Sequence, residues 1–517
     1  AAHHEWLPRV FGLLGQESEH LGKARLVCGS WAEQVLGGLR SLHPIRGTPW
    51  ERSAPCAGRL LRRCGGLKEL TIDMTGALWR QLSTQEEAEL LGEVCGLAQL
   101  QSLRVYEERL MPSHLVALAP LLPRLKSLSL ATRASQASQA ELTDAMAALS
   151  AVTNLELDVS NMSGDSADAS HGVPAAGLAA LPHCLTSLRL DRVAFGQDSL
   201  ACLRALPSLS SLWLVRCTFS GRMGLAGASS LRSLTLCVWM RPMEGDLEDI
   251  LRLRDLRQLR VAKFDPPPGY LARLPVALPS LTSLSLQSWE SVSDGALQPL
   301  GRLTGLTHLE VSAEDTGENA ELEGGGLMHL SGLSSLSSLT LGHHTHHEFL
   351  CNGLPHLRDL PALTSLDIHD AELNSFLATS MPTQLQHLGL ECCFPPEEGA
   401  NMETTRTLAT IAERCPGLTT IDLAFNDTVS LEGLAQLNRL TGLRRILLDD
   451  ESTLFAPLAE LPPVLNALFK VWPSHVAHHP WYHRERMPGT TRSAAAAVAR
   501  LCATLTSTSN PPPPPPP

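Results

Sequence analysis

A six-residue pattern, L-x-x-L-x-L, recurs along most of this 517-residue chain and limits its fold more than any other feature. It occurs fifteen times with aliphatic replacements, from residues 67–72 to residues 443–448, and a degraded copy follows at 464–470. The central positions of successive copies lie 22 to 33 residues apart, most often 25. A period of this length is typical of a repeat solenoid, whereas leucine-rich helices would repeat every 3.6 residues.

Each copy of the pattern ends in L-x-L, the alternation that a β-strand requires. We expect the two leucines to fill the interior and the middle residue to face solvent on a concave side. The connecting segments would return along a convex side, and several have helical patterning: 144–152, 293–306 and 402–418. Thr143–Asp144 and Ser293–Asp294 supply N-cap chemistry before the first two. Neighbouring repeats must stack, because one repeat cannot bury its apolar face alone.

Over residues 60–470 the chain resembles leucine-rich-repeat proteins, and the segment CPGLTTIDL at 415–423 resembles their cysteine-containing, ribonuclease-inhibitor-like subclass. The resemblance implies an α/β fold, a leucine-rich-repeat solenoid. Such a solenoid is a curved horseshoe with a parallel concave sheet and a helical or irregular convex side.

The family usually places Asn or Cys three residues after the L-x-L triplet, where the side chain bonds to the backbone of the turn. Three repeats match this rule, with Cys217, Cys393 and Asn426. Three others carry an aromatic residue there: Trp239, Phe264 and Trp289. We therefore expect irregular turns in the second group.

The segment WLPRVFGLLGQESEHLGKARLVCGSW at residues 6–31 contains a Leu-Pro pair, helical spacing of apolar residues and a closing ARLVCGSW. It resembles an F-box, a small helical module that docks on the Skp adaptor of a cullin-type ubiquitin ligase. The resemblance implies adaptor-facing or module-core roles for Leu7, Pro8, Val10, Leu13, Leu14, Leu26, Val27 and Trp31. The alternative is a plain helical cap on the first repeat, which every solenoid needs.

The middle residues of the L-x-L triplets form a ladder that would line the concave face. Arg104, Arg189, Trp213 and Arg260 lie in the first half of this ladder, and Glu310, Asp367 and Asp422 lie in the second. The candidate partner-binding residues are Arg104, Tyr106, Arg189, Trp213, Arg260, Glu310, Asp367 and Asp422. An exposed Trp213 between arginines has the composition of an interface hot spot, and the gradient suits a partner of opposite gradient. The alternative is that Trp213 packs on its neighbours.

The overall charge argues against two classes of partner. The net charge is −12 and the pI about 5.9, without a run of Lys and Arg, so we expect neither nucleic acid nor membrane binding. No apolar stretch reaches 18 residues, and the first sixteen residues lack the features of a signal peptide. The 13 scattered cysteines include no CxxC pair, which favours a reducing compartment, cytoplasmic or nuclear.

Catalytic chemistry finds no support in the sequence. Two histidine clusters, at 343–349 and 475–483, lack a metalloprotease motif, and we interpret them as polar loops rather than metal sites. Phosphate-binding loops, dinucleotide fingerprints and nucleophile elbows are missing. We therefore expect no enzyme, no cofactor and no metal.

The predicted organisation has five parts. They are an F-box-like module (1–45), a linker and first-repeat entry (46–66), a solenoid of about fifteen to sixteen repeats (67–470), a C-terminal cap with an Ala-rich helix (471–505), and a disordered polyproline tail (506–517). The leading hypothesis is an F-box substrate receptor of a cullin-type ubiquitin ligase that holds a target protein on its concave face. The alternative is a non-catalytic scaffold in a stable assembly.

Overall fold

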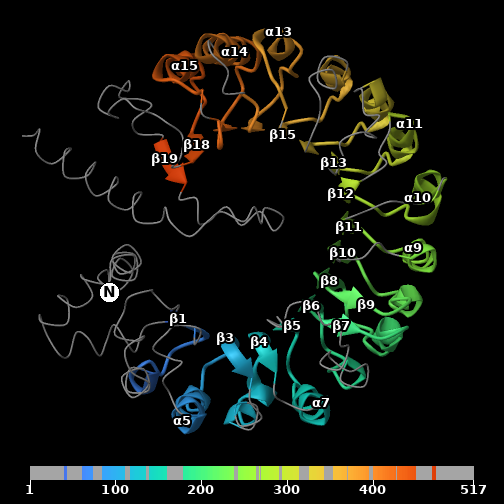
Figure 1. The fold of residues 1–517 in the computed structure, drawn as a ribbon, viewed down its shortest axis with the longest axis vertical. Helices are drawn as coiled ribbons and strands as arrows, with labels where there is room; N and C mark the ends of the chain where they lie inside the picture. The colour runs from blue at the N-terminus through green and yellow to red at the C-terminus, as the bar shows by residue number, and fades with distance from the viewer. Residues whose placement is uncertain are drawn as a thin grey trace, which may run out of the picture. The chain divides into compact units, whose positions relative to one another are not determined.

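The computed structural model divides into two compact units, Ala1–Leu281 and Thr282–Pro517. It describes residues 40–42, 61–73, 84–110, 114, 117–135, 139–159, 178–237, 243–262, 267, 269–289, 294–313, 325–342, 353–369, 371–394, 400–426, 428–449 and 469–472. Each unit has a parallel sheet on one side and helices on the other (Figure 1). We call the sheet face turned away from the helices the concave face.

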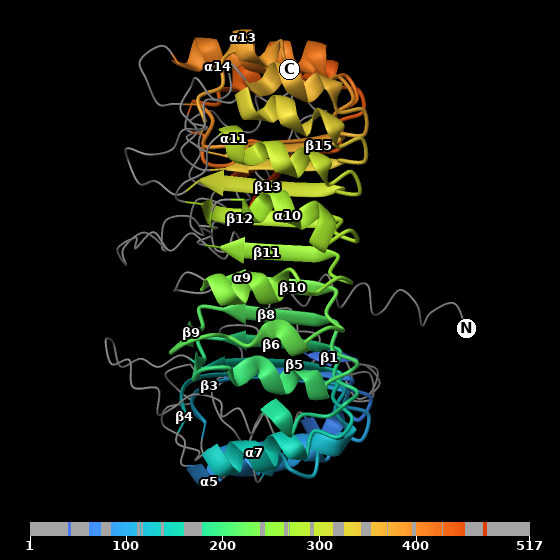
Figure 2. The ribbon, with the colours of Figure 1, turned by 90° about the vertical axis from the view of Figure 1, so that its right-hand side faces the viewer.

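In the first unit, each strand of the main sheet pairs in parallel with the next main-sheet strand along the chain. The strands are β1 (Ser41–Leu42), β2 (Glu69–Asp73), β3 (Ser102–Leu110), β4 (Ser127–Ser135), β5 (Asn154–Val159), β6 (Ser187–Asp191), β8 (Ser211–Val215), β10 (Ser233–Cys237) and β11 (Gln258–Ala262). Figure 2 shows β6, β8, β10 and β11 running side by side. A separate two-stranded sheet joins β7 (Ala194–Phe195) to β9 (Thr218–Phe219).

Helical segments cover the other side of this unit. They are α5 (Thr84–Cys95), η3 (Leu122–Arg124), α7 (Gln139–Ala147), η5 (Ser199–Ala205), η6 (Leu225–Gly227), α9 (Glu244–Ile250) and α10 (Tyr270–Ala277). Two of them, η3 and η6, are single 3₁₀ turns of three residues. The carboxylate of Asp246 caps α9 by accepting a hydrogen bond from the backbone N–H of its N-cap residue, Met243 (3.1 Å). It also accepts one from the backbone N–H of Met223 in the preceding repeat (2.7 Å).

The second unit repeats the plan, with parallel strands that pair in chain order. The strands are β12 (Ser283–Trp289), β13 (His308–Ala313), β14 (Ser338–Gly342), β15 (Ser365–His369), β16 (His387–Glu391), β17 (Thr420–Asp422), β18 (Arg445–Asp449) and β19 (Phe469–Trp472). The helical segments are α11 (Asp294–Leu297), η7 (Gln298–Arg302), η8 (Gly325–Gly332), η9 (Leu354–Asp359), α13 (Ser375–Ala378), α14 (Ala400–Arg414), α15 (Leu431–Gln436) and η10 (Leu437–Arg439).

Stacked leucines form the core of each unit. Leu188, Leu212 and Leu234 lie side by side in register, and none of them is exposed to solvent. Leu388 takes the same place in the second unit and is also fully buried. Burying one such side chain contributes about 1.5–3 kcal/mol, and the contribution recurs with every repeat. The predicted α/β solenoid with a parallel sheet is confirmed.

The turn after the strand is regular in four repeats. The residue before the Cys/Asn position has a positive φ of 52° to 58° in each of them: Arg192, Arg216, Cys392 and Phe425. The thiol of Cys217 donates to the carbonyl of Leu190 (3.3 Å), and the amide of Asn426 donates to three carbonyls and accepts from two N–H groups. The predicted role of this position is confirmed.

The helix predictions are partly confirmed. The 402–418 segment forms α14, and 293–306 contains α11 and η7. The predicted N-cap at Thr143–Asp144 is wrong, because α7 begins earlier, at Gln139, in a stretch of good helix formers. Trp289 ends β12 beyond a register shift, rather than entering a turn as Cys217 does. Trp239, Phe264, the F-box-like residues, the two histidine clusters and the predicted Ala-rich helix and tail lie outside the described residues.

Candidate partner-binding face

A groove of about 550 Å³ lies on the concave face of the first unit. Its lining comes from six neighbouring strands, β2 to β6 and β8. The lining residues are Glu69, Leu70, Thr71, Ser102, Leu103, Arg104, Ser127, Leu128, Ser129, Asn154, Leu155, Glu156, Ser187, Arg189 and Trp213. Ladder residues from several repeats therefore line one groove.

Strand register brings five ladder residues into one row. Arg104 pairs with Ser129, Ser129 with Glu156, Glu156 with Arg189, and Arg189 with Trp213. Neighbouring parallel strands lie about 4.8 Å apart, so these side chains are within reach of one another. Residues more than 100 positions apart in the sequence therefore share one surface.

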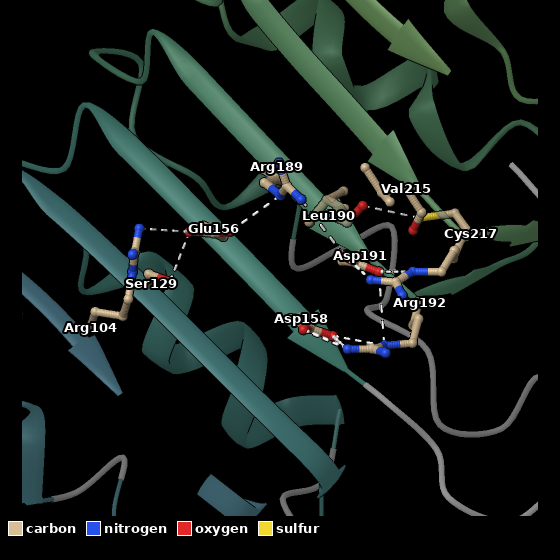
Figure 3. Close-up of polar contacts among 11 residues, drawn as sticks. Arg104, Ser129, Glu156, Asp158, Arg189, Leu190, Asp191, Arg192, Val215 and Cys217 are labelled. Atoms are coloured by element: carbon tan, nitrogen blue, oxygen red, sulfur yellow. Dashed lines mark hydrogen bonds and ion pairs between the residues drawn. The ribbon is translucent and has the colours of Figure 1, made fainter. Parts of the chain in front are cut away.

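The Glu156 carboxylate is the centre of this row (Figure 3). Its Oε2 accepts a hydrogen bond from the Ser129 hydroxyl at 2.9 Å and a longer one from Arg104 Nη2 at 3.4 Å. Its Oε1 lies 3.1 Å from Arg189 Nε. We call Arg104, Ser129, Glu156 and Arg189 the Glu156 cluster.

Trp213 lies at the end of the row, against the Glu156 cluster. The guanidinium carbon of Arg189 is 5.2 Å from the centre of the indole ring, which is cation–π distance. The indole N–H donates to the hydroxyl of Ser211 at 3.0 Å, which fixes the ring's orientation. The residue nevertheless remains 39% exposed, so the ring packs on Arg189 and still offers surface to a partner.

Two bidentate ion pairs stand at the ends of the strands beside the cluster. Arg192 holds Asp158 at 2.7–3.0 Å, and Arg216 holds Asp191 at 2.7 and 3.0 Å. The bond to Asp191 raises the pKa of Arg216. Burial raises the pKa of Asp158, against the opposing hydrogen bond from Arg192. In each pair the arginine of one repeat reaches the carboxylate of the preceding repeat.

The sequence prediction did not include these pairs. Arg192 and Arg216 occupy the strained left-handed turn position that an L-residue other than Gly seldom adopts. A signal was present for Arg216, which directly precedes Cys217, whereas Arg192 precedes Val193. The partner carboxylates could be found only through the register.

A row of small polar residues was also missed, and four of its six members line the groove: Ser102, Ser127, Asn154 and Ser187. The residue before each inner leucine is Ser102, Ser127, Asn154, Ser187, Ser211 and Ser233 on successive strands of the main sheet. We call this the serine row. The recurrence of L-x-S-L in the sequence would have identified it.

The concave face of the second unit is built around carboxylates. Glu310 accepts a hydrogen bond from the Ser285 hydroxyl at 2.7 Å and a short one from the Gln287 amide. Asp367 lies 2.8 Å from Nε2 of His387, and Glu391 lies 2.9 Å from Nδ1 of His369. In this unit, histidines and neutral donors hold the acids.

Gly389 makes room for the Asp367–His387 contact. A Cβ at Gly389 would overlap the carboxylate of Asp367, which leans across this position. The hydrogen bond that His387 donates to the Asp367 carboxylate raises the pKa of His387 above its ordinary value. On the far side of Gly389, burial raises the pKa of Asp422, although the backbone N–H of Ala424 donates to it at 3.0 Å.

The other predicted ladder residues do not join the groove of the first unit. Tyr106 is half-buried on β3 and is not part of the lining. Arg260 lies on β11, two strands from Trp213, with Thr235 between them. The eight predicted adaptor-facing residues lie outside the described part of the chain.

The described residues provide few reactive groups. No three of their His, Cys, Asp and Glu side chains gather in a way that could hold a metal ion. Burial raises the pKa of the Cys217 and Cys415 thiols to about 12, which makes them poor nucleophiles. Within the same part of the chain, no helix is long and apolar enough to cross a membrane.

The repeating L-x-L strands, the parallel ladder in chain order and the Cys or Asn turn together decide the fold. It is a leucine-rich-repeat fold. No family model matches the sequence, and no curated protein matches it either.

Two solved structures illustrate the similarity. An internalin from Listeria monocytogenes aligns with a TM-score of 0.36 and 18% identity, over 81% of this chain and 93% of that one. TLR13, in its complex with ssRNA13, aligns with a TM-score of 0.39 and 16% identity, over 81% of this chain and 58% of that one.

Proposed function

We propose that this chain is a non-catalytic receptor that holds another protein in the groove of its first unit. The Arg189–Trp213 stack carries the proposal, because it places an exposed aromatic ring and a guanidinium at one end of the groove. Trp and Arg dominate the binding energy of protein interfaces when they are held rigidly. The leucine core supplies that rigidity.

We further propose that the bound protein is delivered to a cullin-type ubiquitin ligase. The support is the F-box-like segment at 6–31 and the common family pairing of an F-box with leucine-rich repeats. The second candidate is a scaffold in a stable assembly, with the N-terminal segment as a plain cap. The two candidates share the groove and differ only in the adaptor.

Site-specific photocrosslinking in cells tests the first proposal. A photoreactive phenylalanine analogue replaces Thr71, which lines the groove one strand from Arg104, or Val276, which is 86% exposed on α10. We expect a discrete crosslinked protein from position 71 and none from position 276. Absence of any adduct at 71, or the same adducts at both positions, would contradict groove binding.

Co-expression with a Skp-type adaptor tests the second. The full chain should co-purify with the adaptor, and Leu7→Asp or Trp31→Ala should abolish the complex. Trp213→Ala is the matched control, since a groove variant should keep the adaptor while losing the partner. Failure of the unmodified chain to bind the adaptor at micromolar concentration would favour the scaffold.

A further inference from the structure

The strongest unexplained feature of the groove is that two arginines converge on one carboxylate of the same chain. Arg104 approaches Glu156 from two strands away on one side, and Arg189 approaches from the adjacent strand on the other. Both guanidinium groups lie in the lining of an open groove. Glu156 thus occupies a position where a carboxylate from outside would also be attracted.

Arg104 is held weakly in this arrangement. Its Nη2 is 3.4 Å from Glu156 Oε2, beyond the usual range for a charge-assisted hydrogen bond of 2.7–2.9 Å. The same oxygen already accepts the shorter bond from Ser129. Half of the Arg104 side chain is exposed, so its guanidinium is accessible to a ligand.

Arg189 is oriented but not saturated. Its Nε is buried and faces Glu156 Oε1 at 3.1 Å without the alignment of a hydrogen bond. Its Nη2 lies 3.8 Å from Asp191 Oδ2, too far for a hydrogen bond. The indole of Trp213 supports the guanidinium from the side. A planar fork fixed in this way matches the two oxygens of a carboxylate.

The groove lining contains two arginines and two glutamates, Glu69 and Glu156, and Glu69 is exposed on β2, at the opposite end of the groove from Trp213. Asp191 is 5% exposed and is already bound by both nitrogens of the Arg216 fork. Glu156 is shared among three donors. On the floor, the serine row offers hydroxyls that can bond to a polypeptide backbone.

We propose that the groove binds an acidic polypeptide segment, with a ligand carboxylate replacing Glu156 at Arg104 and Arg189. Glu156 then acts as a built-in competitor that keeps the two arginines paired when the groove is empty. This inference rests on the proposed function, since it names the chemistry of the partner that the groove holds.

Fluorescence anisotropy with labelled peptides and the full chain tests the inference. The probe is a decapeptide of alternating Glu and Ser, compared with its Gln counterpart and with a thymidine oligonucleotide of ten nucleotides. We expect the Glu peptide to bind more tightly than the Gln peptide. Added salt should weaken binding of the Glu peptide.

Substitutions at Glu156 and at the two arginines should change the affinity for the Glu peptide in opposite directions. Glu156→Gln removes the competitor and should raise affinity for the Glu peptide by about three- to tenfold, while Arg104→Gln and Arg189→Gln should lower it by a similar factor. Arg189→Lys keeps the charge, loses the planar fork and should also weaken binding. Arg254→Gln, an exposed residue outside the groove, is the matched control and should bind as the unmodified chain does.

Three outcomes overturn the inference. If Glu156→Gln binds the Glu peptide no more tightly than the unmodified chain does, and has the same circular dichroism spectrum, then Glu156 does not compete with the ligand. Tighter binding of the oligonucleotide than of the Glu peptide would assign the groove to phosphates instead. If the peptide does not bind but crosslinking at position 71 is intact, the acidic segment alone is overturned. If both are lost, groove binding itself is overturned.

Discussion

The concave faces of the two units are built on the same ladder with opposite chemistry. In the first unit, Arg104 and Arg189 surround one shared carboxylate. In the second, Asp367 sits beside Gly389 and is held by a histidine. The core leucines beneath both faces are equally buried. The scaffold therefore sets stability, and the middle residue of each rung sets what a face can bind.

The largest expected effect tests the claim that the two units share one scaffold. Leu212→Ala and Leu388→Ala each remove a fully buried leucine from an equivalent rung. Each should cost about 2–5 kcal/mol of unfolding free energy, because the rigid rungs cannot close the cavity. Urea unfolding followed by circular dichroism measures this. A cost in one unit and none in the other would break the equivalence.

The next effect compares the turns of the two units. Asn426 satisfies five backbone groups, and Asn426→Ala should cost about 2–4 kcal/mol because several buried groups lose their partners. Cys217→Ala removes only weak thiol bonds and should cost about 1 kcal/mol. The same urea assay ranks them. Equal costs would mean that the turn does not depend on the amide.

A smaller effect should distinguish the second unit by its response to pH. The hydrogen bond that His387 donates to Asp367 raises the pKa of His387 above the ordinary 6.5. Asp422 acts in the same direction, and burial and Arg445 act against it. Because the pKa of His387 is higher in the folded state than in the unfolded state, protonation of His387 stabilises the folded state. This contribution is complete below pH 6.5 and is lost as the pH rises through the raised pKa.

The unmodified chain should therefore exceed His387→Gln in stability by up to about 1 kcal/mol near pH 5.5 and by less near pH 8.5. Urea midpoints at the two pH values give the difference. The serine-row position equivalent to His387 in the first unit is Ser187, and Ser187→Ala should show no such pH dependence. A stability gap for His387→Gln that grows with pH would contradict the assignment.

The smallest expected effect on stability is that of Arg104→Gln. The pair with Glu156 is exposed and long, so its loss should change unfolding free energy by less than about 0.5–1 kcal/mol. The same variant should weaken binding of the acidic peptide. A large loss of stability would mean that Arg104 belongs to the scaffold rather than to the binding surface.

The fold could be predicted from the sequence because the leucine pattern is periodic and by itself locates the strand of each repeat. The L-x-L triplet of each repeat within the described residues begins on a strand, from Leu70 to Ile446, although β17 ends at Asp422, one residue before Leu423. The ladder residues followed from the same pattern, including the neighbouring positions of Arg189 and Trp213. Local signals were weaker, and the N-cap assigned to Thr143–Asp144 failed because favourable helix formers precede it.

The contacts of the candidate site could not be predicted in the same way. The pairing of Arg192 with Asp158, or of Arg104 with Glu156, depends on how far a side chain reaches across strands. It also depends on the left-handed turn that aims Arg192 backwards. Sequence spacing gives the order of the rungs, but side-chain direction is determined only once the strands are in register.

The serine row has a consequence for the direction of a bound chain. A hydroxyl can donate or accept a hydrogen bond, so a floor of serines accommodates an extended polypeptide running either way across the strands. Polarity must then come from the asymmetric end of the groove, where Trp213 stands beyond Arg189. Arg189 and Trp213 would thus determine the direction in which the bound polypeptide runs, whereas the serines of the floor would favour neither direction.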